Sequence, residues 1–174
     1  MAPSLRLDAA GQDEAAALLR TCCGSTRWVD RMLGRRPFGT RDSLLAAARE
    51  EWFTLSRADW REAFAQHPAI GERESLRRRF PSTGHLSERE QAGVATAPDD
   101  VIDALARANA EYLQRFGWIF IVCAAGRSAE EMLALLRARM ANDPETEIRV
   151  AAEEQARITE LRLVGIENAV TRSP

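Results

Sequence analysis

The stretch PDDVIDALARANAEYLQRFG, residues 98–117, predicts a long helix and decides the fold class. Pro98 and Asp99 suit the first turn of a helix, where proline is tolerated and acidic side chains are favoured. Gly117 suits the position just beyond the last turn, and neither glycine nor proline interrupts the residues between. We therefore expect a helix from Asp99 to Phe116.

Helical patterns of the same kind fill the chain before this stretch. Apolar residues between Asp42 and Leu55 recur at spacings of three and four, which is typical of an amphipathic helix. Pro68 disfavours helical geometry in the residue before it, so the helix that opens at Ser56 or Arg57 is expected to end there. The helices expected in this part of the chain cover residues 11–19, 28–33, 42–55 and 56–66.

The rest of the chain predicts loops, further helices and one extended segment. Residues 73–86 are polar and predict a loop. SERE at 87–90 and SAEE at 128–131 both have the spacing of a capping box, so we expect a helix to start at each. WIFIV at 118–122 favours an extended segment, but one such segment cannot form a sheet. The last helix is expected over 144–165, because a proline begins it and a glycine follows its pattern.

These patterns predict an all-α, single-domain bundle of about eight helices with a substrate pocket, spanning residues 1–174. The composition, with 45% apolar and 29% charged residues, is ordinary for a globular protein. A net charge of −2 with well-mixed charges argues against a nucleic-acid partner, since RRR at 77–79 is the one uncompensated basic run. The apolar run at 118–125 is too short for the roughly 20 residues that span a bilayer.

Residue usage also predicts where the protein works. Three cysteines without a C-x-x-C pair argue against a disulfide framework and favour a reducing cytoplasm. We expect no secretory signal at the N-terminus and no peroxisomal Ser-Lys-Leu address at the C-terminus. Every basic residue is arginine, which favours a GC-rich bacterial source and excludes Schiff-base chemistry through a lysine.

His67 is the first candidate for chemistry. The chain lacks H-E-x-x-H, a glycine-rich phosphate loop and G-x-S-x-G, and its two histidines, His67 and His85, make a poor zinc site. His67 follows the end of a predicted helix, whose carbonyls favour a protonated imidazole suited to proton delivery. A histidine that merely caps those carbonyls would occupy the same position, so both interpretations stay open.

Ser87, Glu90 and Gln91 lie at the start of a predicted helix. The capping box alone explains Ser87 and Glu90. A helix start also offers free N–H groups and a positive dipole end that can receive an anionic substrate, and Gln91 adds an amide there. The sequence allows both functions.

Arg162 is unusual because its helical position coincides with an apolar face. It comes four residues after Ile158 and eleven after Ala151, so at 100° per residue it projects from nearly the same side. A charge on an apolar face reaches outward or meets a partner. That partner is either a carboxylate of the protein or a carboxylate of a ligand, which the planar guanidinium can grip.

Five segments in order resemble one enzyme family. They are CCGSTRWVDRMLGRRPF, FAQHPAIGE, SEREQAGV, ANAEYLQRFGWIFIVCAAGRSAEEMLALLRARMAND and ITELRL. Together they closely resemble the 2-oxo-4-hydroxy-4-carboxy-5-ureidoimidazoline (OHCU) decarboxylases of uric acid breakdown, over roughly residues 15 to 165. Ala69 departs from the pattern, because bacterial relatives often carry arginine after the His-Pro pair.

The resemblance implies an all-helical fold and a cofactor-free decarboxylation that yields (S)-allantoin and carbon dioxide. It implies that His67 is the catalytic acid, and we expect Glu90 to act with it by holding or tuning the imidazole. It further implies a homodimer, functional coupling to hydroxyisourate hydrolase and urate oxidase, and no metal. The residues it implies in substrate binding are Pro68, Ser87, Glu90, Gln91, Phe120, Ile121, Val122, Cys123, Ala124 and Arg162.

Two other functions compete with this one. A non-catalytic helical module would bind ureides or a partner protein through the same pocket, but a pure binder has little need of an acid such as His67. A metal-dependent ureide hydrolase would lose activity with a chelator, and the scarcity of ligand residues argues against it.

Overall fold

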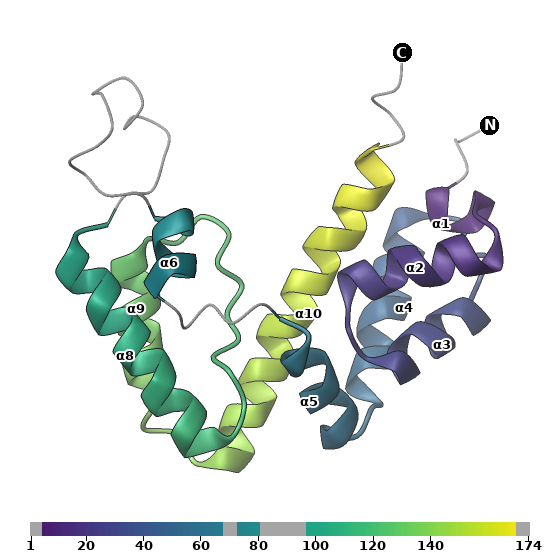
Figure 1. Ribbon diagram of the computed structural model, residues 1–174. Helices are drawn as coiled ribbons and strands as arrows, with labels where there is room; N and C mark the ends of the chain where they lie inside the picture. Colours follow the sequence, from purple (N-terminus) through teal and green to yellow (C-terminus); the bar gives the residue numbers. More distant parts are fainter. Residues whose placement is uncertain (1–4, 68–72, 81–96, 170–174) are drawn as a thin grey trace, which may run out of the picture. The chain divides into compact units, whose positions relative to one another are not determined.

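The computed structural model describes residues 5–67, 73–80 and 97–169, and in these ranges it contains nine α-helices and no strand (Figure 1). This confirms the predicted all-α class. The chain divides into two compact units, Met1–Gln66 with Ala152–Pro174, and His67–Ala151. The single domain over residues 1–174 stays a prediction. Within the described ranges, no helix is both long enough and apolar enough to cross a bilayer.

The first unit is built from short helices and the second part of a long one. Its helices are α1 (Arg6–Ala9), α2 (Gln12–Cys22), α3 (Thr26–Gly34), α4 (Arg41–Phe53), α5 (Arg57–Ala65) and the later turns of α10 (Pro144–Ala169). The short helix α1 was not predicted, because it depends on a partner distant in sequence. Glu167 of α10 accepts hydrogen bonds from the backbone amides of Arg6 and Leu7, at 2.7 and 3.2 Å.

The predicted end of the last helix at Gly165 is wrong, because α10 continues to Ala169. A glycine inside a helix costs only about 1 kcal/mol relative to alanine. Leu163 and Glu167 are both buried on either side of Gly165, and this burial stabilises the helix through the glycine. The predicted start is confirmed, since Asp143 accepts from the amide of Thr146 at 3.0 Å.

Tryptophan side chains organise the core of the first unit. Trp28 is fully buried, and its indole N–H donates to the carbonyl of Ala48 at 3.0 Å. Trp52 donates in the same way to the carbonyl of Ala152 at 2.9 Å, which joins α4 to α10. Both indoles therefore bury a large apolar surface without leaving a polar group unsatisfied.

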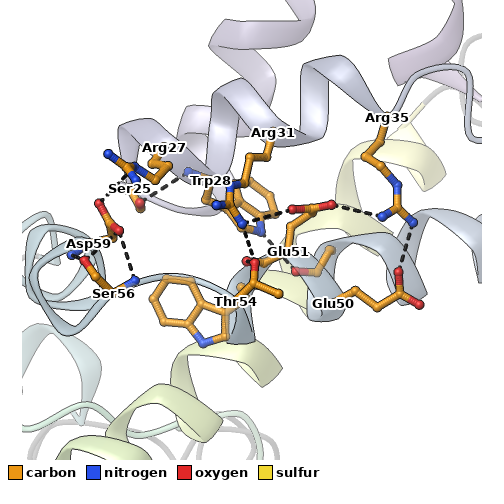
Figure 2. Close-up of polar contacts among 12 residues, drawn as sticks. Ser25, Arg27, Trp28, Arg31, Arg35, Glu50, Glu51, Thr54, Ser56 and Asp59 are labelled. Carbon is orange, nitrogen blue, oxygen red and sulfur yellow. Dashed lines mark hydrogen bonds and ion pairs between the residues drawn. The ribbon is translucent and has the colours of Figure 1, made fainter.

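Polar side chains join α3, α4 and α5 on the surface of the first unit (Figure 2). Ser25 caps α3, and Ser56 with Asp59 forms a complete capping box at the start of α5. Arg35, directly after the end of α3, binds Glu51 of α4 at 2.9 Å. Exposed ion pairs contribute only about 0–1 kcal/mol each, so the caps and the buried tryptophans set the packing of these helices.

The second unit contains α6 (Arg73–Arg79), α8 (Asp99–Phe116), α9 (Ala129–Arg139) and the first turns of α10. The predicted bounds of α8 are confirmed, and Gly117 ends it in the left-handed conformation with φ 79°. The predicted capping box at 128–131 is also confirmed at the start of α9.

The loop predicted over 73–86 is wrong in its first part, where α6 forms. Straight-chain residues that favour helices outnumber others in this segment, and Leu76 is completely buried. Arg77 then ties the end of α6 to the start of α8 by donating to the carbonyls of Phe80 and Ala97, at 3.2 and 2.7 Å. The capping box predicted at 87–90 lies outside the described residues.

Candidate functional site

The predicted site residues fall into three groups. Arg162 belongs to the first unit, whereas His67 and residues 120–124 belong to the second. The remaining four, Pro68, Ser87, Glu90 and Gln91, lie outside the described residues, as does Ala69.

The position of His67 is set by the end of α5, the helix directly before it in the chain. His67 is half-buried and follows Gln66, whose amide donates back to the carbonyl of Ala63 at 3.2 Å. Phe64 anchors this last turn in the core with no exposed surface. The helix therefore ends just before Pro68, as the sequence predicts, and His67 directly follows a turn that is anchored in the core.

The turn CCGS at 22–25 fixes Gln66 from another direction. A Cβ atom built on Gly24 would lie 2.5 Å from both Cβ and Cγ of Gln66, so any side chain at position 24 would displace that residue. Thr26 adds a second tie, since its hydroxyl donates to Glu62 of α5 at 2.7 Å. Gly24 could not be predicted as a candidate from local sequence, because its φ is not positive and only the close approach of Gln66 requires glycine.

Residues 120–124 form a buried segment without helix or strand between α8 and α9 (Figure 1). Phe120, Ile121, Val122 and Ala124 are buried, and Cys123 is half-buried. Three arginines donate to carbonyl oxygens of this segment, namely Arg139 to Ile121 at 2.7 Å, Arg127 to Cys123 at 3.1 Å and Arg79 to Ala124 at 3.0 Å. Side chains thus satisfy backbone groups that a neighbouring strand would satisfy in a sheet.

Arg139 belongs to a buried polar cluster. Its Nε and Nη2 lie 2.7 and 2.5 Å from the same carboxylate oxygen of Glu147, which has no exposed surface. Tyr112 donates its hydroxyl to that oxygen, and Asn142 donates to the other at 2.8 Å. Burial, together with the hydrogen bond to Glu147, raises the pKa of Tyr112 well above its usual range, so the phenol stays protonated. Tyr112 is therefore a core residue.

The sequence also indicates that Arg139 is unusual. Met132 and Leu136 are buried on α9, and Arg139 comes seven and three residues after them. It therefore lies on the apolar face of its helix, which is the same feature that singled out Arg162. A cavity of about 480 Å³ lies next to Ala124. Arg79 and Arg127, the other two arginines that donate to the segment, both line it.

Arg162 is exposed, but a hydrogen bond holds its guanidinium against the end of α2. Its Nη1 donates to the carbonyl of Cys22 at 3.2 Å, and the hydroxyl of Thr159 approaches the same oxygen at 3.5 Å. Among the described residues no carboxylate pairs with Arg162, so the protein partner is a carbonyl at the end of α2. Carbonyls in the last turn of a helix have no intrahelical partner, which makes this one available.

The thiols beside Arg162 are buried. Burial raises the pKa of Cys22 to about 11 and that of Cys23 to about 12, and the nearby positive charge of Arg162 offsets only part of this. Both therefore remain neutral thiols at physiological pH, unlike the thiolates that act as nucleophiles. Within the described ranges, no group of three or more His, Cys, Asp or Glu side chains is arranged to hold a metal ion.

Comparisons with known proteins relate the chain to one family. A family model described as OHCU decarboxylase matches residues 8–164. The "Uric acid degradation bifunctional protein TTL" of Arabidopsis thaliana is 36% identical over 154 residues, which are 88% of this chain and 46% of that protein. The chain therefore spans about half the length of this relative.

Two further relatives are similar over most of their own length. The 2-oxo-4-hydroxy-4-carboxy-5-ureidoimidazoline decarboxylase of Amia calva is 33% identical over 131 residues, 75% of this chain and 74% of that protein. A solved structure titled "Crystal structure of OHCU decarboxylase in the presence of (S)-allantoin" has a TM-score of 0.70 and 32% identity. The match covers 91% of this chain and 99% of that one.

Proposed function

Because the chain belongs to the OHCU decarboxylase family, we infer that it is a carboxy-lyase of urate degradation, within purine metabolism. It removes carbon dioxide from OHCU and yields (S)-allantoin. The family match across nearly the whole chain is the observation that carries this inference, and the all-α fold agrees with it.

The reaction does not require a cofactor in chemical terms. When the carbon–carbon bond to the carboxylate breaks, carbon dioxide leaves and the bonding electrons pass into the conjugated imidazoline ring of the substrate. These electrons form a double bond between the carbon that lost the carboxylate and the ring carbon that bears the ureido group. One proton then adds to the ureido-bearing carbon, while the hydroxyl on the decarboxylated carbon gives up its proton and becomes the ring carbonyl. The face of the ureido-bearing carbon that the proton reaches decides which enantiomer of allantoin forms. The protein has to orient the carboxylate, stabilise the developing charge and supply that proton from one side.

Our proposal gives His67 the role of proton donor and Glu90 the role of holding its imidazole. Ser87 and Gln91 hydrogen-bond the ureido and ring groups, and Pro68 takes part in substrate binding. Arg162 binds an anionic oxygen of the substrate, which is consistent with a guanidinium whose protein partner is a neutral carbonyl rather than a carboxylate.

The segment Phe120, Ile121, Val122, Cys123 and Ala124 contacts the substrate mainly through its backbone in this proposal. Four of these side chains are buried in the second unit, so their backbone is the part best suited to meet a ligand. The buried, protonated thiols of Cys22 and Cys23 take no chemical part.

Circular dichroism during enzymatic oxidation of urate, with hydroxyisourate hydrolase present, tests the activity. Adding the chain is expected to accelerate the appearance of a persistent (S)-allantoin signal, whereas slow formation of racemic allantoin at an unchanged rate would refute the activity. His67→Asn, checked for native folding by its far-ultraviolet spectrum and thermal unfolding, is expected to abolish the acceleration. Full activity of that variant would refute the role of His67 while leaving the reaction in place.

The proposal also covers the cellular setting of the enzyme. We place it in the bacterial cytoplasm as a homodimer, functionally coupled to hydroxyisourate hydrolase and urate oxidase. The similarity to a bifunctional protein of uric acid degradation supports that coupling. Light scattering after size-exclusion chromatography tests the dimer, and a mass near 19.4 kDa would contradict it.

A further inference from the structure

We propose that Arg139, Arg127 and Arg79 are positioning residues that hold the backbone of residues 120–124 in the geometry needed for catalysis. This inference rests on the proposed function, in which the same segment contacts the substrate. It concerns only the second unit, which contains all the groups involved.

The segment depends on side chains for its shape. Residues 120–124 have neither helical hydrogen bonds nor, within the described ranges, a neighbouring strand to fix them. The three arginines instead donate hydrogen bonds to the carbonyl oxygens of Ile121, Cys123 and Ala124, at 2.7, 3.1 and 3.0 Å. Because buried carbonyls require partners, these bonds restrict where the backbone can lie.

Arg139 is the most constrained of the three. One side of its guanidinium binds Glu147, while Nη1 reaches Ile121, so the planar group joins α10 to the segment. Glu147 is in turn held by Tyr112 and Asn142. The guanidinium also lies 4.6 Å from the centre of the Phe120 ring, which fixes a second residue of the segment.

Arg127 and Arg79 act at the other end of the segment. The backbone amide of Arg127 donates to the carbonyl of Ala124 at 3.2 Å, closing a turn directly after the segment. Arg79 reaches the same carbonyl from the end of α6. The segment is thus fixed at its start from α9 and at its end from α6 and from its own turn.

This arrangement matters for function because a backbone contact cannot be adjusted by its own side chain. Its precision depends on the groups that support the backbone. A substitution far from the reacting atoms that misplaces the substrate by about 1 Å can lower the rate by about 100-fold. We therefore expect loss of the Arg139–Ile121 bond to lower kcat/KM on the order of 10- to 100-fold in a protein that still folds.

The test uses two variants of the Arg139 anchor. Arg139→Met combined with Glu147→Gln removes the bond to Ile121 while leaving no unpaired buried charge, and Tyr112 keeps an acceptor. Arg139→Lys keeps a positive charge beside Glu147, but its single nitrogen replaces the guanidinium fork. Both are expected to fold and to lose kcat/KM, and hydrogen exchange of the amides in residues 120–124 is expected to become faster.

Two control variants separate positioning from general damage. Tyr112→Phe removes one of the two groups that hold Glu147 but keeps Asn142 as the other, so Arg139 keeps its contacts with Glu147 and Ile121. Arg115→Met removes an arginine that donates to the carbonyl of Asn142 outside the segment. Both are expected to keep wild-type kcat/KM and wild-type exchange in residues 120–124. Equal losses in the controls and the anchor variants would overturn the positioning role.

The outcomes also distinguish this inference from the proposed function. If the wild-type chain does not accelerate formation of (S)-allantoin, the proposed function fails, and the exchange measurement alone decides whether the arginines hold the segment. If the wild type is active and folded Arg139→Lys has full kcat/KM with unchanged exchange, the inference fails and the proposed function stands.

Discussion

Replacing Arg139 alone by methionine is expected to destabilise the protein strongly, because it leaves a buried carboxylate without its cation. Glu147 has no exposed surface and receives both Nε and Nη2 of Arg139, at 2.7 and 2.5 Å. Removing one member of a buried ion pair costs about 3–5 kcal/mol. For a chain of 174 residues, 1 kcal/mol lowers Tm by about 2–4 °C, so Arg139→Met is expected to lower Tm by about 6–20 °C.

The double variant Arg139→Met/Glu147→Gln supplies the comparison that tests this reasoning. It contains no buried charge at the pair, and the amide oxygen of glutamine can still accept from Tyr112. Its main loss is the hydrogen bond to the carbonyl of Ile121, and an unsatisfied buried acceptor costs about 1–3 kcal/mol. The double variant is therefore expected to be more stable than Arg139→Met, although it carries one more substitution.

Urea unfolding followed by circular dichroism measures both changes as shifts in the midpoint at constant slope. If Arg139→Met and the double variant were equally destabilised, the uncompensated charge of Glu147 would not be the cause. Arg139 would then contribute by packing alone, and the ion pair at 2.5 Å would have little energetic meaning.

The first unit provides three further predictions. Burial raises the pKa of Cys22 to about 11 and that of Cys23 to about 12, from an ordinary value of 9.0. Above about pH 9 the folded protein therefore keeps thiol protons that the unfolded chain loses, so the free energy of unfolding is expected to fall as the pH rises above 9. Urea unfolding at pH 8 and pH 10 should show this loss in the wild type, and a Cys22→Ala/Cys23→Ala variant without a smaller loss would contradict it. The same two thiols are expected to react with a chromogenic disulfide at pH 8 only after unfolding, so rapid reaction of either in the native protein would show that it is not buried. Gly24→Ala is expected to lower kcat/KM in a folded protein by displacing Gln66, whereas Gly34→Ala, where nothing lies within 4 Å, serves as the matched control and should leave it unchanged.

The parts of the fold that the sequence predicted correctly are those that depend on neighbouring residues. Gly117 ends α8, and the capping box at 128–131 begins α9, because each effect acts within one helical turn. The helix α6 depends instead on burial of Leu76, and the last turns of α10 depend on Glu167, which is buried and accepts hydrogen bonds from the amides of Arg6 and Leu7. Local composition does not contain that information, so a polar helix was predicted as a loop and an interior glycine as an end.

The same difference between local patterns and distant contacts applies to the candidate site. Helical periodicity identified Arg162 as a charge on an apolar face, and the structure supplies the carbonyl of Cys22 as its partner. The same periodicity applies to Arg139, but its role depends on Ile121, which lies 18 residues earlier in the chain. A contact of this kind is formed only by the fold, so the residues that support the segment could not be predicted together with the residues that form it.

The stereochemistry of the product offers a way to separate the role of the arginines from that of the proposed acid. OHCU also decays spontaneously to racemic allantoin, so the enantiomeric excess measures how far the enzyme outpaces that decay. An Arg139→Lys enzyme with lower kcat/KM should give a lower excess at a fixed concentration, and the full excess should return when the enzyme concentration is raised in proportion. The reason is that, in the proposed mechanism, His67 selects the face that receives the proton, whereas residues 120–124 set how often the substrate is correctly placed. An excess that stays low at high enzyme concentration would show that residues 120–124 also decide the face, and the separation of roles would be wrong.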